Sequence, residues 1–79
     1  MSDYKPYPAP QNKRSGCKVG WYYYADKVDA EKCAEAAGHN ARLMLSDGYD
    51  FGYCWPGSIE SIPADSKSEY AGLYEVTIA

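Results

Sequence analysis

The sequence lacks the signals of several large functional classes. It has no run of about 18 apolar residues, the length that a membrane-spanning helix needs. Its first residues, MSDYKPYPAPQNKRSG, lack the apolar stretch of a secretory signal peptide. Cys17, Cys33 and Cys54 are an odd number without CxxC spacing, whereas small secreted scaffolds usually carry even disulfide sets. We therefore expect a cytoplasmic protein with reduced thiols and no membrane segment.

Patterns for catalysis and metal binding are missing as well. His39 is the single histidine, and no serine or cysteine lies in a nucleophile signature such as GxSxG. The cysteines lack the paired ligand spacing of a zinc site, and Gly48, Gly52 and Gly57 form neither GxGxxG nor a P-loop. We expect no catalytic residue, no metal and no cofactor. The enzyme alternative is a Cys-His pair that only the fold assembles.

Tyrosine is what the chain has in excess. Its 79 residues include nine Tyr, two Trp and one Phe, more large rings than so small a core encloses. The charge is unevenly distributed, because residues 1–20 carry a net +3 and residues 21–79 carry a net −6. Tyr and Trp are enriched in protein interfaces. Several rings are therefore expected on the surface of an acidic body.

The N-terminal segment differs in composition from the rest of the chain. Pro6, Pro8 and Pro10 fix the backbone φ angle and disfavour helix at the residues before them. We predict a flexible or polyproline-II arm over residues 1–16 and one α+β domain over residues 17–79. The arm has the spacing of a proline-rich ligand, and the alternative is a solvated tail.

One strand and one helix are predicted in the first half of the domain. Residues 19–25 are rich in β-formers, with Tyr22 and Tyr24 on one face and Trp21 and Tyr23 on the other. Asp26 is a suitable N-cap for a helix that runs to about residue 47. Apolar residues at spacings of three and four form its stripe: Ala30, Cys33, Ala34, Ala37, Ala41, Met44 and Leu45. Gly48 suits the left-handed residue after the helix.

Further strands are predicted in the second half. Residues 49–55 resemble a second strand, Pro56-Gly57 a turn, residues 58–62 a short third strand, and residues 70–78 the last strand. This order predicts an α+β fold: a three- or four-stranded, mainly antiparallel sheet with one helix packed on one face. The other face of the sheet stays open. If the first two strands are adjacent and parallel, the helix is a right-handed crossover.

One resemblance to known proteins involves the middle of the chain. The run GYDFGY at residues 48–53, followed by PGSI at residues 56–59 after an alanine-rich helix, resembles small accessory proteins encoded by bacteriophages. The resemblance implies a role on host machinery, as an inhibitor of a defence system, a polymerase modulator or a virion component. It transfers no functional residue, because that loose group shares no motif.

These observations favour a small non-catalytic binding module that docks on a larger host protein and inhibits or modulates it. Rigid aromatic rings dominate interface energetics, and an acidic body complements a basic partner. The predicted partner-binding residues are Tyr22, Tyr24, Asp50, Tyr53, Trp55 and Glu60. The alternative for each ring is ordinary core packing.

Direct binding of nucleic acid is the alternative function. Strand aromatics stack on bases, and basic side chains contact phosphates. The residues involved would be Tyr22, Tyr24, Phe51 and Tyr53 for stacking, with Lys13 and Arg14 for phosphates. An acidic body opposes this function, because phosphate neutralisation dominates such affinity. An open sheet face also allows pairing with a second copy, so a homodimer is a further hypothesis.

Overall fold

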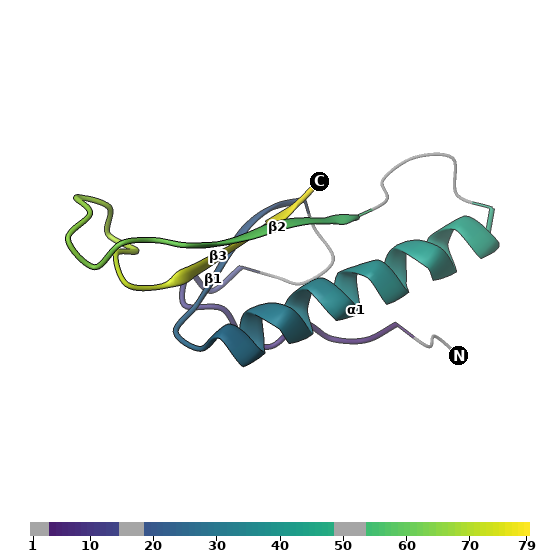
Figure 1. Ribbon diagram of the computed structural model, residues 1–79. Helices are drawn as coiled ribbons and strands as arrows, with labels where there is room; N and C mark the ends of the chain where they lie inside the picture. Colours follow the sequence, from purple (N-terminus) through teal and green to yellow (C-terminus); the bar gives the residue numbers. More distant parts are fainter. Residues whose placement is uncertain (1–3, 15–18, 49–53) are drawn as a thin grey trace.

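A computed structural model describes residues 4–14, 19–48 and 54–79 (Figure 1). In these ranges the elements are β1 (Gly20–Tyr24), α1 (Lys27–Ser46), β2 (Pro56–Ser61) and β3 (Tyr74–Ile78). The strands form one antiparallel sheet in the order β1-β3-β2. α1 lies on one face of the sheet and contacts every strand. The predicted α+β fold, with one helix packed on a small antiparallel sheet, is confirmed.

The helix has the predicted bounds because its local signals are strong. Asp26 has an extended backbone immediately before α1, although its side chain makes no capping hydrogen bond. Gly48 has a φ of 87° just after α1, the left-handed conformation that glycine adopts without steric cost. The buried side of α1 consists mainly of small residues: Ala30, Cys33, Ala36, Ala37, Gly38, Asn40 and Ala41. Small side chains allow the helix axis to lie close to the sheet.

The core lies between α1 and the inner face of the sheet. Tyr22 is 0% exposed and Tyr24 is 1% exposed, and both pack with Val76 and Ile78 of β3. Tyr22 is paired directly with Val76, so their side chains share this face. Tyr22 and Tyr24, which the sequence predicts as partner-contacting residues, are therefore buried in the core. These rings supply the volume that the small side chains of α1 do not.

The strand β2 overlaps the short strand predicted over residues 58–62, but it begins earlier, at Pro56. The strand expected over residues 49–55 falls mostly on residues 49–53, which lie outside the described ranges, and the expected turn at Pro56-Gly57 is the start of β2. Pro56 is tolerated because β2 is an edge strand, where a missing N–H leaves no ladder bond unmade. A Cβ at Gly57 would lie 3.1 Å from the carbonyl oxygen of Thr77, next to a register irregularity between Pro56 and Ile59. Glycine thus allows the main chains of β2 and β3 to lie close together at this bulge.

The central strand is the last one in the chain. β3 lies between β1 and β2, so those two strands are not adjacent. The hypothesis of a parallel crossover involves the strand predicted over residues 49–55, of which residues 49–53 lie outside the described ranges. β3 begins at Tyr74, four residues after the predicted start, because the chain turns through Gly72, whose φ is 82°. Val76 and Ile78 face the core as predicted, and Tyr74 is partly buried.

Residues 4–14 lie along α1 and β1 (Figure 1). They are held to the body by hydrogen bonds, which differs from the solvated tail considered above. The main-chain N–H of Gln11 donates to the carbonyl of Tyr23, and the side chain of Asn12 donates to the carbonyl of Trp21. These two contacts lie at the outer edge of β1, the edge that faces away from β3. There they supply hydrogen-bond donors to main-chain carbonyls that no neighbouring strand pairs with.

Candidate functional site on the open sheet face

The face of the sheet opposite α1 carries a mixed aromatic and acidic surface. Within the described residues no helix or strand covers this face (Figure 1). Directly paired residues have side chains on the same face, and the open face includes the pairs Trp21 with Thr77, Tyr23 with Glu75, and Glu60 with Glu75. We call these five residues, together with Tyr70 and Trp55, the open face.

Two tyrosines are stacked at one end of the open face. The rings of Tyr23 and Tyr70 have centroids 3.8 Å apart and planes 7° from parallel. The hydroxyl of Tyr23 donates a hydrogen bond of 2.9 Å to Oε2 of Glu75. Burial, together with Glu75, raises the pKa of Tyr23 to about 12, so the hydroxyl stays a donor at neutral pH. Burial and Glu69 also raise the pKa of Tyr70.

Two carboxylates meet beside the stacked rings. Glu60 of β2 is paired directly with Glu75 of β3, and like charges placed opposite each other destabilise a sheet. The hydrogen bond from Tyr23 compensates only part of this repulsion, because it satisfies one oxygen of Glu75. A cationic group bound here would form charge-assisted hydrogen bonds with both carboxylates and cation–π contacts with the neighbouring rings.

Apolar side chains are exposed at the other end of the open face. Trp21 is 54% exposed, and Val19, just before β1, is also 54% exposed. An open hollow of about 550 Å³ lies beside them, lined also by Arg14, Thr77 and Ala79. Exposure of more than half of an indole, next to a second exposed apolar side chain, is typical of a contact surface.

Trp55 extends this apolar end from the β2 side. Its main-chain N–H donates to the carbonyl of Ala79, and the N–H of Ala79 donates to the carbonyl of Trp55, both at 2.9 Å. This reciprocal pairing places the indole on the same face as Ala79, and alternation along β3 gives Ala79 the face of Thr77. Trp55 is 38% exposed, so part of the ring is available to a partner.

The structure thus separates the six predicted partner-binding residues into three groups. Tyr22 and Tyr24 are in the core, and Asp50 and Tyr53 lie outside the described residues. Trp55 and Glu60 are exposed on the open face. Sequence reasoning missed Trp21, Tyr23, Tyr70 and Glu75. The alternation of β1 gave the correct grouping of its rings but not the face that each group takes.

Among residues 4–14, 19–48 and 54–79, no cluster of three or more His, Cys, Asp and Glu side chains has the proximity that a metal ion needs. In the same ranges, no helix has the length and apolarity to cross a membrane. Burial raises the pKa of the Cys33 thiol, more than its hydrogen bond with Tyr24 lowers it. This thiol is therefore protonated at neutral pH.

These features define a small two-layer α+β protein whose open sheet face combines exposed indoles, stacked tyrosines and paired carboxylates. No protein-family model matches the chain, and no curated protein or solved structure matches it. The functional argument therefore depends on the chemistry of the surface.

Proposed function

We propose that this protein is a non-catalytic binding module whose open face docks on a larger protein. The observation that carries the proposal is the exposure of Trp21 on the same uncovered sheet face as the stacked Tyr23 and Tyr70. Rigid rings bury a large area with little loss of conformational entropy, so Trp and Tyr dominate interface hot spots. The stacked pair is already ordered before a partner arrives, which lowers the entropic cost of association further.

The charge on the open face favours a basic partner. Glu60 and Glu75 repel each other across the strands, and a Lys or Arg from a partner would relieve that repulsion. A host protein that handles nucleic acid presents such a basic surface. With the resemblance to phage accessory proteins, this favours inhibition or modulation of a defence or nucleic-acid-handling complex in the host cytoplasm.

Affinity capture from host lysate tests this proposal. The bait would be the full chain, compared with Trp21→Ala and Glu75→Gln variants. The control is Leu45→Ala, which removes another apolar side chain, 49% exposed, from α1 on the opposite side of the sheet. The expected result is one protein retained by the wild type and by Leu45→Ala and lost from both open-face variants. Equal capture by all four baits would contradict the proposal.

Direct nucleic-acid binding is the second candidate, and one observation favours it. Arg14 and Trp21 line the same hollow, which places a cation next to a stacking surface. Of the four rings first considered for stacking, Tyr22 and Tyr24 are buried, and Phe51 and Tyr53 lie outside the described residues. Glu60 and Glu75 would repel phosphates nearby. Titration of indole fluorescence with single-stranded DNA and RNA at two salt concentrations distinguishes the candidates, because phosphate contacts weaken steeply with salt.

A further inference from the structure

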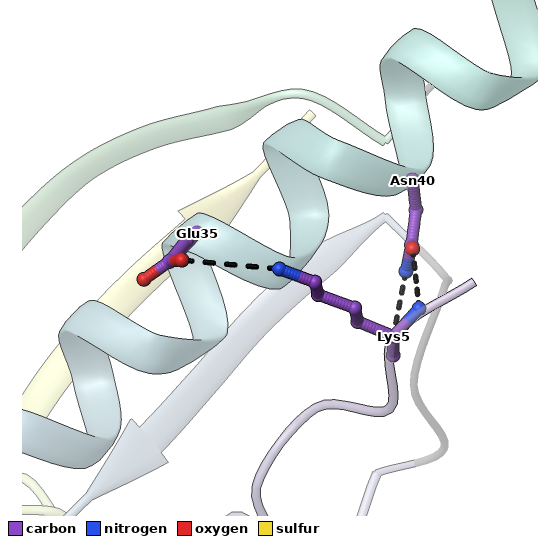
Figure 2. Close-up of polar contacts among 3 residues, drawn as sticks. All are labelled: Lys5, Glu35 and Asn40. Carbon is purple, nitrogen blue, oxygen red and sulfur yellow. Dashed lines mark hydrogen bonds and ion pairs between the residues drawn. The ribbon is translucent and has the colours of Figure 1, made fainter. Parts of the chain in front are cut away.

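The N-terminal arm packs against α1 and β1, and a buried side chain recognises its main chain. We call the surface that the arm covers, formed by Asn40 of α1 and by Tyr22 and Tyr24 of β1, the groove. Asn40 of α1 is 0% exposed. Its Oδ1 accepts a hydrogen bond of 2.7 Å from the main-chain N–H of Lys5, and its Nδ2 donates one of 2.9 Å to the Lys5 carbonyl (Figure 2). This is the reciprocal pattern that a neighbouring strand makes in an antiparallel sheet. It requires an extended segment but not a lysine.

Two core tyrosines contact the arm beyond this point. The ring of Tyr7 packs edge-on against Tyr22, with centroids 5.2 Å apart and planes at 78°. The hydroxyl of Tyr24 donates a hydrogen bond of 2.9 Å to the carbonyl of Pro8. The body therefore contacts three arm positions through specific groups. The prolines between them bring no N–H donor into the groove, and they hold the segment extended in advance.

The arm does not fill the groove. An open pocket of about 400 Å³ remains between arm and helix, lined by Lys5, Pro6, Pro8, Lys32, Glu35 and Ala36. The ammonium of Lys5 lies 3.9 Å from a carboxylate oxygen of Glu35, with both side chains largely in solvent (Figure 2). Such an exposed ion pair contributes little. Recognition therefore depends on the main-chain bonds and the aromatic contact, and space is left for a larger side chain.

We propose that the groove is a recognition site for an extended, proline-containing segment of a partner protein, and that the arm is its intramolecular occupant. The ligand has a non-proline residue opposite Asn40, because that residue must supply both N–H and C=O. Two positions later it has an aromatic ring for Tyr22, and the next carbonyl accepts from Tyr24. The arm competes at an effective concentration in the millimolar range, so it keeps the site closed to weak ligands. This inference is independent of the open face.

The test uses the full chain and a fluorescein-labelled peptide of residues 2–14 as probe. The variant Lys5→Pro removes the main-chain N–H that donates a hydrogen bond to Oδ1 of Asn40. It changes no residue of the groove. We expect its affinity for the peptide to exceed that of the wild type several-fold, up to about tenfold, since one net hydrogen bond is lost from the competing arm. Tyr7→Ala is a second arm variant with the same expected direction. Fluorescence anisotropy gives the dissociation constants.

Changes in the groove complete the test. Adding Asn40→Ala to Lys5→Pro should abolish peptide binding, and adding Tyr24→Phe, which keeps the ring and removes the hydroxyl, should weaken it several-fold. The control Glu31→Ala, an exposed position of α1 outside the groove lining, should leave it unchanged. Absence of peptide binding to both arm variants at millimolar peptide would overturn the proposal. So would binding that neither groove change weakens. If the wild type instead forms a dimer in which each arm occupies the groove of the other copy, the ligand of the groove is a second copy of this chain and the proposal of a different partner protein is wrong.

Discussion

At the scale of single residues, β1 separates its aromatic rings into two sets with different roles. Tyr22 is fully buried, whereas Trp21 beside it is 54% exposed. Tyr22→Ala should lower the free energy of unfolding by about 3–5 kcal/mol, because it leaves a cavity in the core. Trp21→Ala should change it by less than about 1 kcal/mol. Denaturant titration of the two variants measures both, and similar losses would show that the two faces are assigned incorrectly.

The buried hydroxyl of Tyr24 makes stability depend on pH in the alkaline range. Burial raises the pKa of Tyr24 well above its ordinary value of 10. Above pH 10 the unfolded chain releases this proton and the folded chain keeps it, so stability is full below pH 10 and falls as pH rises. The Tyr24 contribution has a limiting slope of about 1.4 kcal/mol per pH unit.

The Tyr24→Phe variant isolates this contribution. Its free energy of unfolding should fall less steeply between pH 10 and 11 than that of the wild type, as urea titrations at a series of pH values would show. Identical slopes in the two proteins would contradict the assignment of a buried, protonated Tyr24.

The sequence predicted that the rings of β1 alternate, and the structure confirms that alternation. It did not determine which set is buried, because both faces of the segment are aromatic. That choice depends on Val76 and Ile78, which lie more than 50 residues away and pair with Tyr22 and Gly20. The stacking of Tyr23 on Tyr70 could not be predicted from the sequence either, because it joins a strand to a distant loop.

At the scale of elements, two glycines of the helical region should respond to alanine in opposite directions. A Cβ at Gly38 would lie 3.6 Å from Cγ of Pro56, an ordinary contact, so Gly38→Ala should stabilise the protein by up to about 1 kcal/mol. Gly48 has space around it but a φ of 87°, so Gly48→Ala should destabilise by about 1 kcal/mol. Thermal melts compare the two variants under one condition, and shifts of equal sign would contradict this account.

Elements with strong local signals were predicted closely, and those defined by distant pairing were not. The bounds of α1 follow from its apolar stripe, its preceding Asp26 and its terminal Gly48. β2 begins at Pro56, a residue that local rules assign to a turn. Only its position at the sheet edge makes proline acceptable there.

At the scale of the whole molecule, the arm completes the core rather than trailing from it. α1 has more extensive contacts with β2 and β3 than with β1, and residues 4–14 occupy the β1 side. Proline content predicted the extended backbone of this segment. The sequence did not predict its docking, because the reciprocal bonds between Asn40 and Lys5 join residues 35 positions apart.

Removal of residues 1–10 should therefore destabilise the whole protein. It deletes both main-chain bonds of Asn40, the hydrogen bond from Tyr24 to Pro8 and the ring contact of Tyr7. Together these predict a loss of about 3 kcal/mol or more, since buried polar groups lose their partners. Equilibrium unfolding in urea gives the difference, and a truncated chain as stable as the full one would contradict a structural role for the arm.

The strand order β1-β3-β2 also has a consequence for synthesis on the ribosome. β3 joins the two other strands, yet it is made after both of them. Until it emerges, the nascent chain holds a helix of 20 residues and an aromatic strand that lacks its pairing partner. Local helix forms within microseconds, whereas this sheet waits for seconds of elongation. The growing polypeptide therefore exposes its tyrosine-rich strand to chaperones, and to aggregation, until β3 has been made.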